Sequence, residues 1–146
     1  SRQRDAMWAI RDDIVGLAAA LYPIIAFDIS VPISDANTYG EGVRRKLQER
    51  WPDTGRNVTF GHLGDSNIHF VMTIGNHDPE QVGEAMKIVY SELAPFGGSV
   101  SAEHGIGLEK KPFLGITRSE IEIGLMRQLK SVLDPKGILN PGKVVS

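Results

Sequence analysis

The sequence predicts an α+β fold, a ferredoxin-like split βαβ sandwich in which an antiparallel sheet carries helices on one face. Two observations predict it. Residues 24 to 103 follow the order strand, helix, strand, strand, helix, strand, which is the order of two split βαβ units. The helical segments between these strands place their apolar residues on one side, as helices that cover a sheet do. Further helices are expected before and after this region.

Three elements are predicted before residue 51. Residues 4–21 have apolar side chains at helical spacing, and Pro23 ends this helix. Residues 24–31 are rich in branched and aromatic side chains and predict a strand, which ends at the following proline. Residues 34–50 predict a helix with Ser34 as its candidate N-cap. The apolar positions are Met7, Ile10, Ile14, Leu17 and Leu21 in the first helix, and Tyr39, Val43 and Leu47 in the second.

The rest of the chain predicts a hairpin, a helix, a short strand and a last helix. Residues 57–63 and 67–74 predict two strands joined by a tight turn. A helix starts near Pro79, residues 99–103 predict the fourth strand, and residues 118–133 predict the last helix. The tail that follows is rich in turn signals. The apolar stripes are Val82, Met86, Val89, Tyr90 and Leu93 in the first of these helices, and Ile121, Leu125, Leu129 and Val132 in the last.

Composition limits the classes of function. The 146 residues, 41% of them hydrophobic, can bury one good core, so we expect a single domain over residues 1–146. A formal net charge of −2, without any block of Lys or Arg, does not favour a nucleic-acid partner or an anionic membrane surface. No apolar run approaches the ~20 residues of a membrane-spanning helix. The lack of cysteine excludes disulfides and thiolate metal sites. Since the chain opens on Ser1 and directly on a predicted helix, we expect an upstream part to be missing.

Two glycine-rich segments, residues 61–69 and 101–107, hold three of the four histidines. If the first segment forms a hairpin that turns on Asp65 and Ser66, His62 lies directly opposite His69. Directly opposed residues share one face of the sheet, with Cβ atoms roughly 4.5–5.5 Å apart. The two imidazoles can then converge on one cation.

Glu103 ends the predicted fourth strand and reaches the same rim of the sheet. Two histidines and one carboxylate are a common ligand set for catalytic zinc, and manganese or iron also accepts it. His104 adds an imidazole that can act as a base beside the metal, although histidines on strands are more often structural. Asp65 either forms an Asx-turn or orients a ligating histidine, and we favour the turn. Lys110 and Lys111 are interpreted as a solvated pair.

Four motifs occur in one order along the chain: residues 28–32 (DISVP), 61–69 (GHLGDSNIH), 98–107 (GSVSAEHGIG) and 133–143 (LDPKGILNPGK). Together they resemble the C-terminal domain of FAD-linked oxidases, a family that includes D-lactate dehydrogenases, the glycolate oxidase FAD subunit and D-2-hydroxyglutarate dehydrogenases. The resemblance covers nearly the whole chain. It implies an N-terminal FAD-binding domain of the vanillyl-alcohol-oxidase type, which is absent here. The chain would then be the later part of the cap (substrate) domain plus the C-terminal helices.

The resemblance implies oxidation of a D-2-hydroxy acid to the 2-oxo acid, with metal-assisted deprotonation of the hydroxyl and hydride transfer to FAD. It also assigns roles to six residues. These are His62, His69 and Glu103 as ligands of a divalent metal, usually zinc or manganese, His104 as catalytic base, Arg11 as the group that binds a substrate carboxylate, and Asn140 as a residue near the flavin.

Three departures from the family bear on the substrate. Members that act on 2-hydroxyglutarate tend to carry polar residues at positions that here are Val15, Ala26 and Val71. The exchanges predict a substrate with an apolar side chain in place of a distal carboxylate.

Two other classes of function stay open at this point. A zinc hydrolase could use the same three ligands to hold a metal-bound water, without a flavin. A non-catalytic ferredoxin-like binding module would need no metal. For the oxidoreductase, the expected partners are a small 2-hydroxy acid and the protein's own FAD-binding domain, without which we expect no turnover. The electron acceptor is unidentified, a homodimer is allowed, and the expected location is the cytoplasm, or the mitochondrion in a eukaryote.

Overall fold

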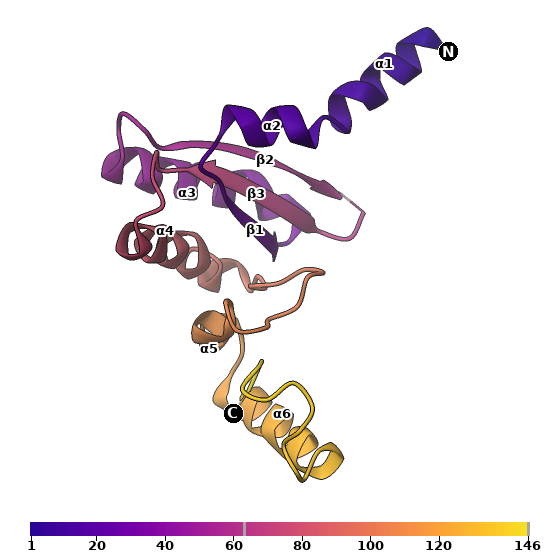
Figure 1. Cartoon of the computed structure of the whole chain (residues 1–146), viewed down its shortest axis with the longest axis vertical. Coiled ribbons are helices and arrows are strands. Elements are labelled where there is room, and N and C mark those ends of the chain that lie inside the picture. Colours follow the sequence, from indigo (N-terminus) through magenta and orange to yellow (C-terminus); the bar gives the residue numbers. More distant parts are fainter. Residues whose placement is uncertain (63, 146) are drawn as a thin grey trace.

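A three-stranded antiparallel sheet organises the fold, which a computed structural model describes over residues 1–62 and 64–145 (Figure 1). The strands are β1 (Ile25–Ser30), β2 (Arg56–His62) and β3 (Asn67–Thr73), in the spatial order β1-β3-β2. Because β3 lies between β1 and β2 and runs antiparallel to both, the strands have the split arrangement that the sequence predicts. The α+β class is therefore confirmed.

One face of the sheet is covered by α3 (Ala36–Arg50) and α4 (Pro79–Ser91), which enclose the main core. The Asp78 side chain caps α4 by accepting the N–H of Gln81 at 3.0 Å, and Pro79 occupies the first turn. The predicted inner faces of both helices are confirmed, since their apolar residues are buried in the core or, for Val82 and Met86, partly buried against it. The fully buried side chains of this core include Ile29, Tyr39, Val43, Leu47, Phe70, Met72, Val89, Tyr90 and Leu93.

The N-terminal helix differs from the prediction because it is broken in two. The observed helices are α1 (Arg2–Arg11) and α2 (Ile14–Ala20). The break falls at two aspartates, where the Asp13 side chain accepts the N–H of Gly16 at 2.8 Å and so starts a new helix. Because α1 extends away from the sheet (Figure 1), the predicted apolar stripe is exposed there, with Ile10 80% accessible.

The hairpin register also differs from the prediction. The structure pairs His62 with Asn67 and Phe60 with His69, so His62 and His69 are not directly opposed. The connection is longer than expected because Asp65 forms an Asx-turn, accepting the N–H of Asn67 at 3.1 Å. The interpretation of Asp65 as a turn residue is thus confirmed. Leu63, the last residue of the predicted strand over residues 57–63, lies outside the described residues.

The predicted fourth strand, residues 99–103, is reduced to one antiparallel bridge between Ser30 and Ser99. The two residues exchange backbone hydrogen bonds of 3.1 and 2.8 Å at the outer edge of β1. Beyond this bridge the backbone turns towards the Asp28 side chain of β1, and strand pairing stops. The sheet therefore keeps the ferredoxin-like order with only a remnant of its fourth strand.

The C-terminal part contains α5 (Leu114–Thr117) and α6 (Glu120–Leu133). Ser119 and Glu122 form a capping box that starts α6, close to the predicted start. Its apolar stripe is mostly exposed, however, and the residues of α6 that pack into a small cluster are Ile123, which is buried, and Met126, which is partly buried. The exposed members are Ile121, Leu125, Leu129 and Val132. Short 3₁₀ helices are η1 (Ile33–Asp35), η2 (Ala94–Phe96) and η3 (Lys111–Phe113). None of the described helices has the length and apolar character needed to cross a membrane.

Candidate functional site

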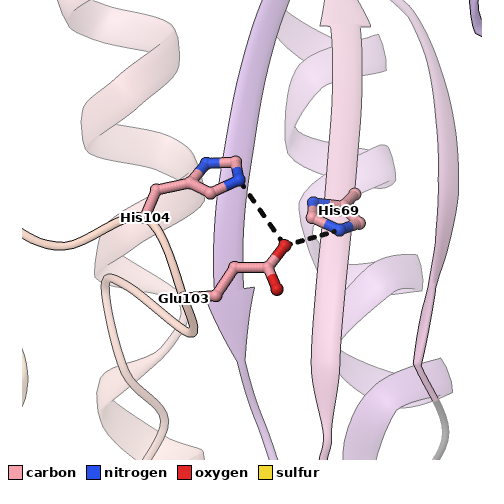
Figure 2. Close-up of side chains that lie close together, drawn as sticks. All are labelled: His69, Glu103 and His104. Atoms are coloured by element: carbon pink, nitrogen blue, oxygen red, sulfur yellow. Dashed lines mark ion pairs between the residues drawn. The ribbon is translucent and has the colours of Figure 1, made fainter.

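The side chains of His69, Glu103 and His104 meet over the sheet face opposite to α3 and α4 (Figure 2). Glu103 Oε1 lies 3.3 Å from His69 Nε2 and 3.5 Å from His104 Nε2. One ligand atom from each of the three residues lies within 4.8 Å of the other two. Two imidazoles and one carboxylate thus converge at one place, from β3 and from the loop that follows the Ser99 bridge.

Strand alternation places His69 on this face. Successive side chains of a strand point to opposite sides, so Phe70 enters the core while His69 and Val71 point away from it. Across the sheet, His69 is paired with Asp28 on β1 and Phe60 on β2. The sheet face opposite to α3 and α4, called the open face below, therefore carries the His69 imidazole between an acidic and an aromatic neighbour.

The carboxylate of Asp28 holds the loop that carries the other two groups. Its Oδ1 accepts the N–H of Ala102 at 3.2 Å and of Glu103 at 3.0 Å, and its Oδ2 accepts the N–H of His104 at 2.8 Å. The hydroxyl of Ser101 also donates to Oδ2, at 2.9 Å. Three consecutive amides and one hydroxyl are thus bound by a single side chain, which is why these residues do not continue the fourth strand.

Lys110 completes this arrangement beneath the loop. Its Nζ donates to Asp28 Oδ2 at 3.0 Å, to the Asp28 carbonyl oxygen at 3.1 Å and to Ser101 Oγ at 3.1 Å. Asp28 is 2% exposed and Lys110 is 8% exposed, so this is a buried ion pair. The interpretation of Lys110 as solvated is therefore wrong. An aspartate inside a buried strand needs a cationic or N–H partner, and this was the signal in the sequence that could have indicated Lys110.

The pKa of Asp28 follows from these contacts. Burial raises the pKa, but the His104 N–H, the Lys110 ammonium and the Ser101 hydroxyl all stabilise the charged form. The net result holds the pKa of Asp28 well below its ordinary value of 3.8. Asp28 is therefore a carboxylate throughout the physiological pH range.

His62, a predicted metal ligand, is near this cluster but not part of it. Its ring centroid lies 5.9 Å from that of His69, in an edge-to-face arrangement. Its Nδ1 lies 3.4 Å from the side-chain nitrogen of Asn67 and 3.9 Å from an Asp65 carboxylate oxygen. The structure brings the predicted ligands His69 and Glu103 together, and joins them with His104 rather than with His62.

Arg11 lies at the end of α1, beside one of two adjoining cavities. The guanidinium pairs with the neighbouring Asp12 at 2.8 Å, and Arg11 shares a cavity of about 380 Å³ with both histidines of the hairpin. A second cavity, of about 390 Å³, shares Leu17, Phe60 and His69 with the first. This second cavity, the "apolar cavity" below, is otherwise lined by Ala18, Ile24, Ala26, Phe27, Val71, Glu103 and His104.

Asn140 belongs to the tail that follows α6 and is not brought into the cluster. Its backbone has a φ of 47°, and its side-chain oxygen accepts a hydrogen bond from Lys143 at 3.2 Å. Further along the tail, the N–H of Val144 donates to the carbonyl of Gly107 at 2.9 Å. The tail thus returns to the glycine-rich bend that follows His104.

Comparison with known proteins agrees with the family resemblance. The family described as "FAD linked oxidases, C-terminal domain" matches residues 1–144. D-2-hydroxyglutarate dehydrogenase of Xanthomonas citri is 40% identical, over 97% of this chain and 31% of the relative. The mitochondrial D-2-hydroxyglutarate dehydrogenase of Rattus norvegicus is 37% identical, over 99% and 26%. That of Arabidopsis thaliana is 32% identical, over 98% and 25%. The chain therefore spans between a quarter and a third of the length of these relatives.

The lowered pKa of Asp28 predicts how an Asp28→Asn variant responds to acid. The native pKa lies below the unfolded value of 3.8, so the charged form contributes stability above that pH. This contribution is lost as the pH falls towards the native pKa. We expect the free energy of unfolding of the wild type to fall more steeply than that of Asp28→Asn between about pH 5 and pH 2.

Urea denaturation of the chain at a series of pH values, with a chelator present, measures both slopes. Asp53→Asn, which removes an exposed carboxylate from the loop after α3, is the matched control and keeps the wild-type slope. Equal slopes for wild type and Asp28→Asn would show that Asp28 is not a stabilising carboxylate.

Proposed function

Because the chain belongs to the C-terminal domains of the FAD-linked oxidases, we propose that it forms part of a flavoprotein that oxidises a D-2-hydroxy acid to the 2-oxo acid. The convergence of His69, Glu103 and His104 beside the apolar cavity is the observation that carries this proposal. Family membership favours it over the zinc hydrolase and the binding module, the two classes that the residues alone left open.

The proposed metal ligands are His62, His69 and Glu103, for zinc or manganese. The donors fit such an ion, since two imidazoles and one carboxylate are a frequent set that leaves positions open for substrate. His62 supports this assignment because it lies on the same strand pair and face as His69, and its side chain is 45% exposed and so accessible. When bound, the ion would supply Lewis acidity at the substrate hydroxyl, and the flavin would supply the hydride acceptor.

His104 is the proposed general base. Its ring lies between two carboxylates, with Nε2 3.5 Å from Glu103 Oε1 and Nδ1 3.8 Å from Asp28 Oδ2. These contacts orient the imidazole over the open face, where it also lines the apolar cavity. From this position His104 would take the proton of the substrate hydroxyl as the C2–H bond breaks.

Arg11 is the proposed partner of the substrate carboxylate. A guanidinium binds a carboxylate with two parallel hydrogen bonds, as Arg11 would do from the cavity that it shares with His62 and His69. Its present partner, Asp12, is an exposed neighbour that a substrate carboxylate could replace. Asn140 is proposed to lie near the flavin, on the tail that returns to the bend after His104.

The substrate side chain is proposed to be apolar. Among the described residues that line the apolar cavity, the ionisable ones are His69, Glu103 and His104, all of them in the cluster itself. The remaining lining is aliphatic or aromatic, with Ala26 and Val71 on neighbouring strands. A second carboxylate placed here would lose its hydration without gaining a cation, which is costly. The relatives are named for D-2-hydroxyglutarate, and this cavity suits a different side chain.

The proposed partner of the chain is the N-terminal FAD-binding domain of the same protein. The exposed apolar side chains of α1 and α6 fit such a partner, because contiguous exposed apolar surface is typical of interfaces. The proposed location is the cytoplasm, or the mitochondrion in a eukaryote, as the name of the rat relative indicates for that protein.

Replacement of single histidines separates the metal ligands from the base. We expect His62→Ala and His69→Ala each to lose the bound ion, because each removes one of three ligands. His104→Ala should keep the ion and lower the rate of flavin reduction about 10²–10⁴-fold, as loss of a general base does. Mass spectrometry of metal content and stopped-flow flavin reduction in the flavoprotein measure these effects.

His77→Ala is the control, since His77 is an exposed histidine of the loop before α4. The opposite pattern, with the ion kept by His62→Ala and lost from His104→Ala, would replace the proposed ligands by His69, Glu103 and His104.

The apolar cavity predicts the order of substrates. We expect kcat/KM for D-2-hydroxyhexanoate to exceed that for D-2-hydroxyglutarate, because the latter places a carboxylate against Ala26 and Val71. An Ala26→Lys variant should raise kcat/KM for D-2-hydroxyglutarate about tenfold, since a hydrogen bond to a charged group is worth roughly 1.5–3 kcal/mol.

Ala94→Lys adds the same charge at an exposed position of η2 and serves as the control. If the wild type prefers D-2-hydroxyglutarate, the proposal of an apolar substrate side chain is wrong. The proposal that the protein oxidises a D-2-hydroxy acid would then still stand.

A further inference from the structure

Neither Asp28 nor Lys110 is a proposed metal ligand or base, yet Glu103 and His104 both depend on this buried pair for the placement of their backbone. We propose that Asp28 and Lys110 are positioning residues that place Glu103 and His104 against His69, and so set the affinity of the site for its divalent ion. This inference rests on the proposed function, because it assigns a role within the same site.

The pairing of strands gives Asp28 its position. Asp28 on β1 is the direct cross-strand partner of His69 on β3, so both side chains lie on the same face of the sheet. The same carboxylate binds the amides of Glu103 and His104, at 3.0 and 2.8 Å. The Asp28 side chain therefore links the strand pair that carries His69 to the backbone of Glu103 and His104. These two residues are 75 and 76 positions away from Asp28 in the sequence.

The loop has little other order of its own. Residues 101–104 form neither helix nor strand, and the consecutive N–H groups of residues 102–104 all point towards one carboxylate. Because the N–H groups of both Glu103 and His104 are held, the peptide planes on either side of the Glu103 Cα are held as well. This placement brings the Glu103 side chain within reach of His69, and its Oε1 lies 3.3 Å from His69 Nε2.

Lys110 keeps the carboxylate charged and directed. The Nζ atom makes three contacts of 3.0–3.1 Å, two to Asp28 and one to Ser101 Oγ. Without the ammonium, a carboxylate that is 2% exposed would lose its cationic partner, and the cost of an unpaired buried charge would favour its movement towards water. Any such movement carries the amides of Glu103 and His104 with it.

The test compares metal affinity with thermal stability in three variants of the full-length flavoprotein. Asp28→Asn replaces one acceptor oxygen by an NH₂ group that faces N–H donors, and Lys110→Met removes the ammonium at nearly constant side-chain length. We expect each to weaken the binding of zinc and of manganese about 10–100-fold, as loss of a group that orients metal ligands does. Competition with a chromogenic chelator gives the dissociation constants, and thermal unfolding of the metal-free protein gives the Tm.

Lys130→Met is the matched control. Lys130 forms the corresponding ion pair with the buried Asp134 at the end of α6, which is outside the metal cluster. We expect this variant to lower the Tm to a similar extent and to leave the dissociation constants for zinc and manganese within about twofold of wild type. Affinity that falls only in proportion to Tm in all three variants would mean a merely structural role, and would overturn the proposal.

Three further outcomes separate this inference from the proposed function. If Asp28→Asn does not fold, Lys110→Met decides alone, and unchanged affinity in that variant overturns the inference. If wild type binds the ions and both variants bind them equally well, the positioning role is wrong while the metal centre stands. A wild-type protein that binds neither zinc nor manganese would overturn the metal centre and the positioning role together.

Discussion

The carboxylate of Asp28 is the constraint on which the candidate site depends. It is buried on β1, it receives the N–H groups of residues 102–104, and the Lys110 ammonium balances its charge. The cost of burying a charge is offset only where such partners are in place, so the strand, the loop and the lysine are fixed together. The tail repeats this arrangement, since Asp134 pairs with Lys130 and accepts the N–H groups of Ile138 and Leu139 at 3.0 and 2.9 Å.

The periodic spacing of apolar residues predicts those elements of the fold that pack against the hydrophobic core. The strands and the two helices over one face were predicted because alternation and the helical stripes show which side of each element is buried. The hairpin register and the fourth strand could not be predicted in this way. The Asx-turn at Asp65 lengthens the hairpin connection and so shifts its register. The side chain of Asp28 binds the amides that would otherwise have extended the fourth strand. Both are contacts between particular polar atoms, which leave no periodic trace.

The candidate site was predictable where residue type alone indicates chemistry. Histidine and glutamate are residue types that commonly bind metals or move protons, and the structure brings His69, Glu103 and His104 together. Lys110 was misinterpreted because its partner lies 82 residues away and its neighbour in sequence is another lysine. The apolar stripes of α1 and α6 indicated faces that would be buried, but among the described residues these faces are exposed. Such a pattern shows that one side of a helix is apolar, and it does not show what that side contacts.

The most direct test of the central claim is anomalous diffraction at the zinc edge from crystals of the zinc-loaded protein. We expect zinc at about 2.0–2.2 Å from nitrogen atoms of His62 and His69 and from a carboxylate oxygen of Glu103. We also expect the loop amides to keep their hydrogen bonds to Asp28, because these hydrogen bonds position the carboxylate of Glu103. Zinc bound elsewhere, or bound with the loop released from Asp28, would contradict the account.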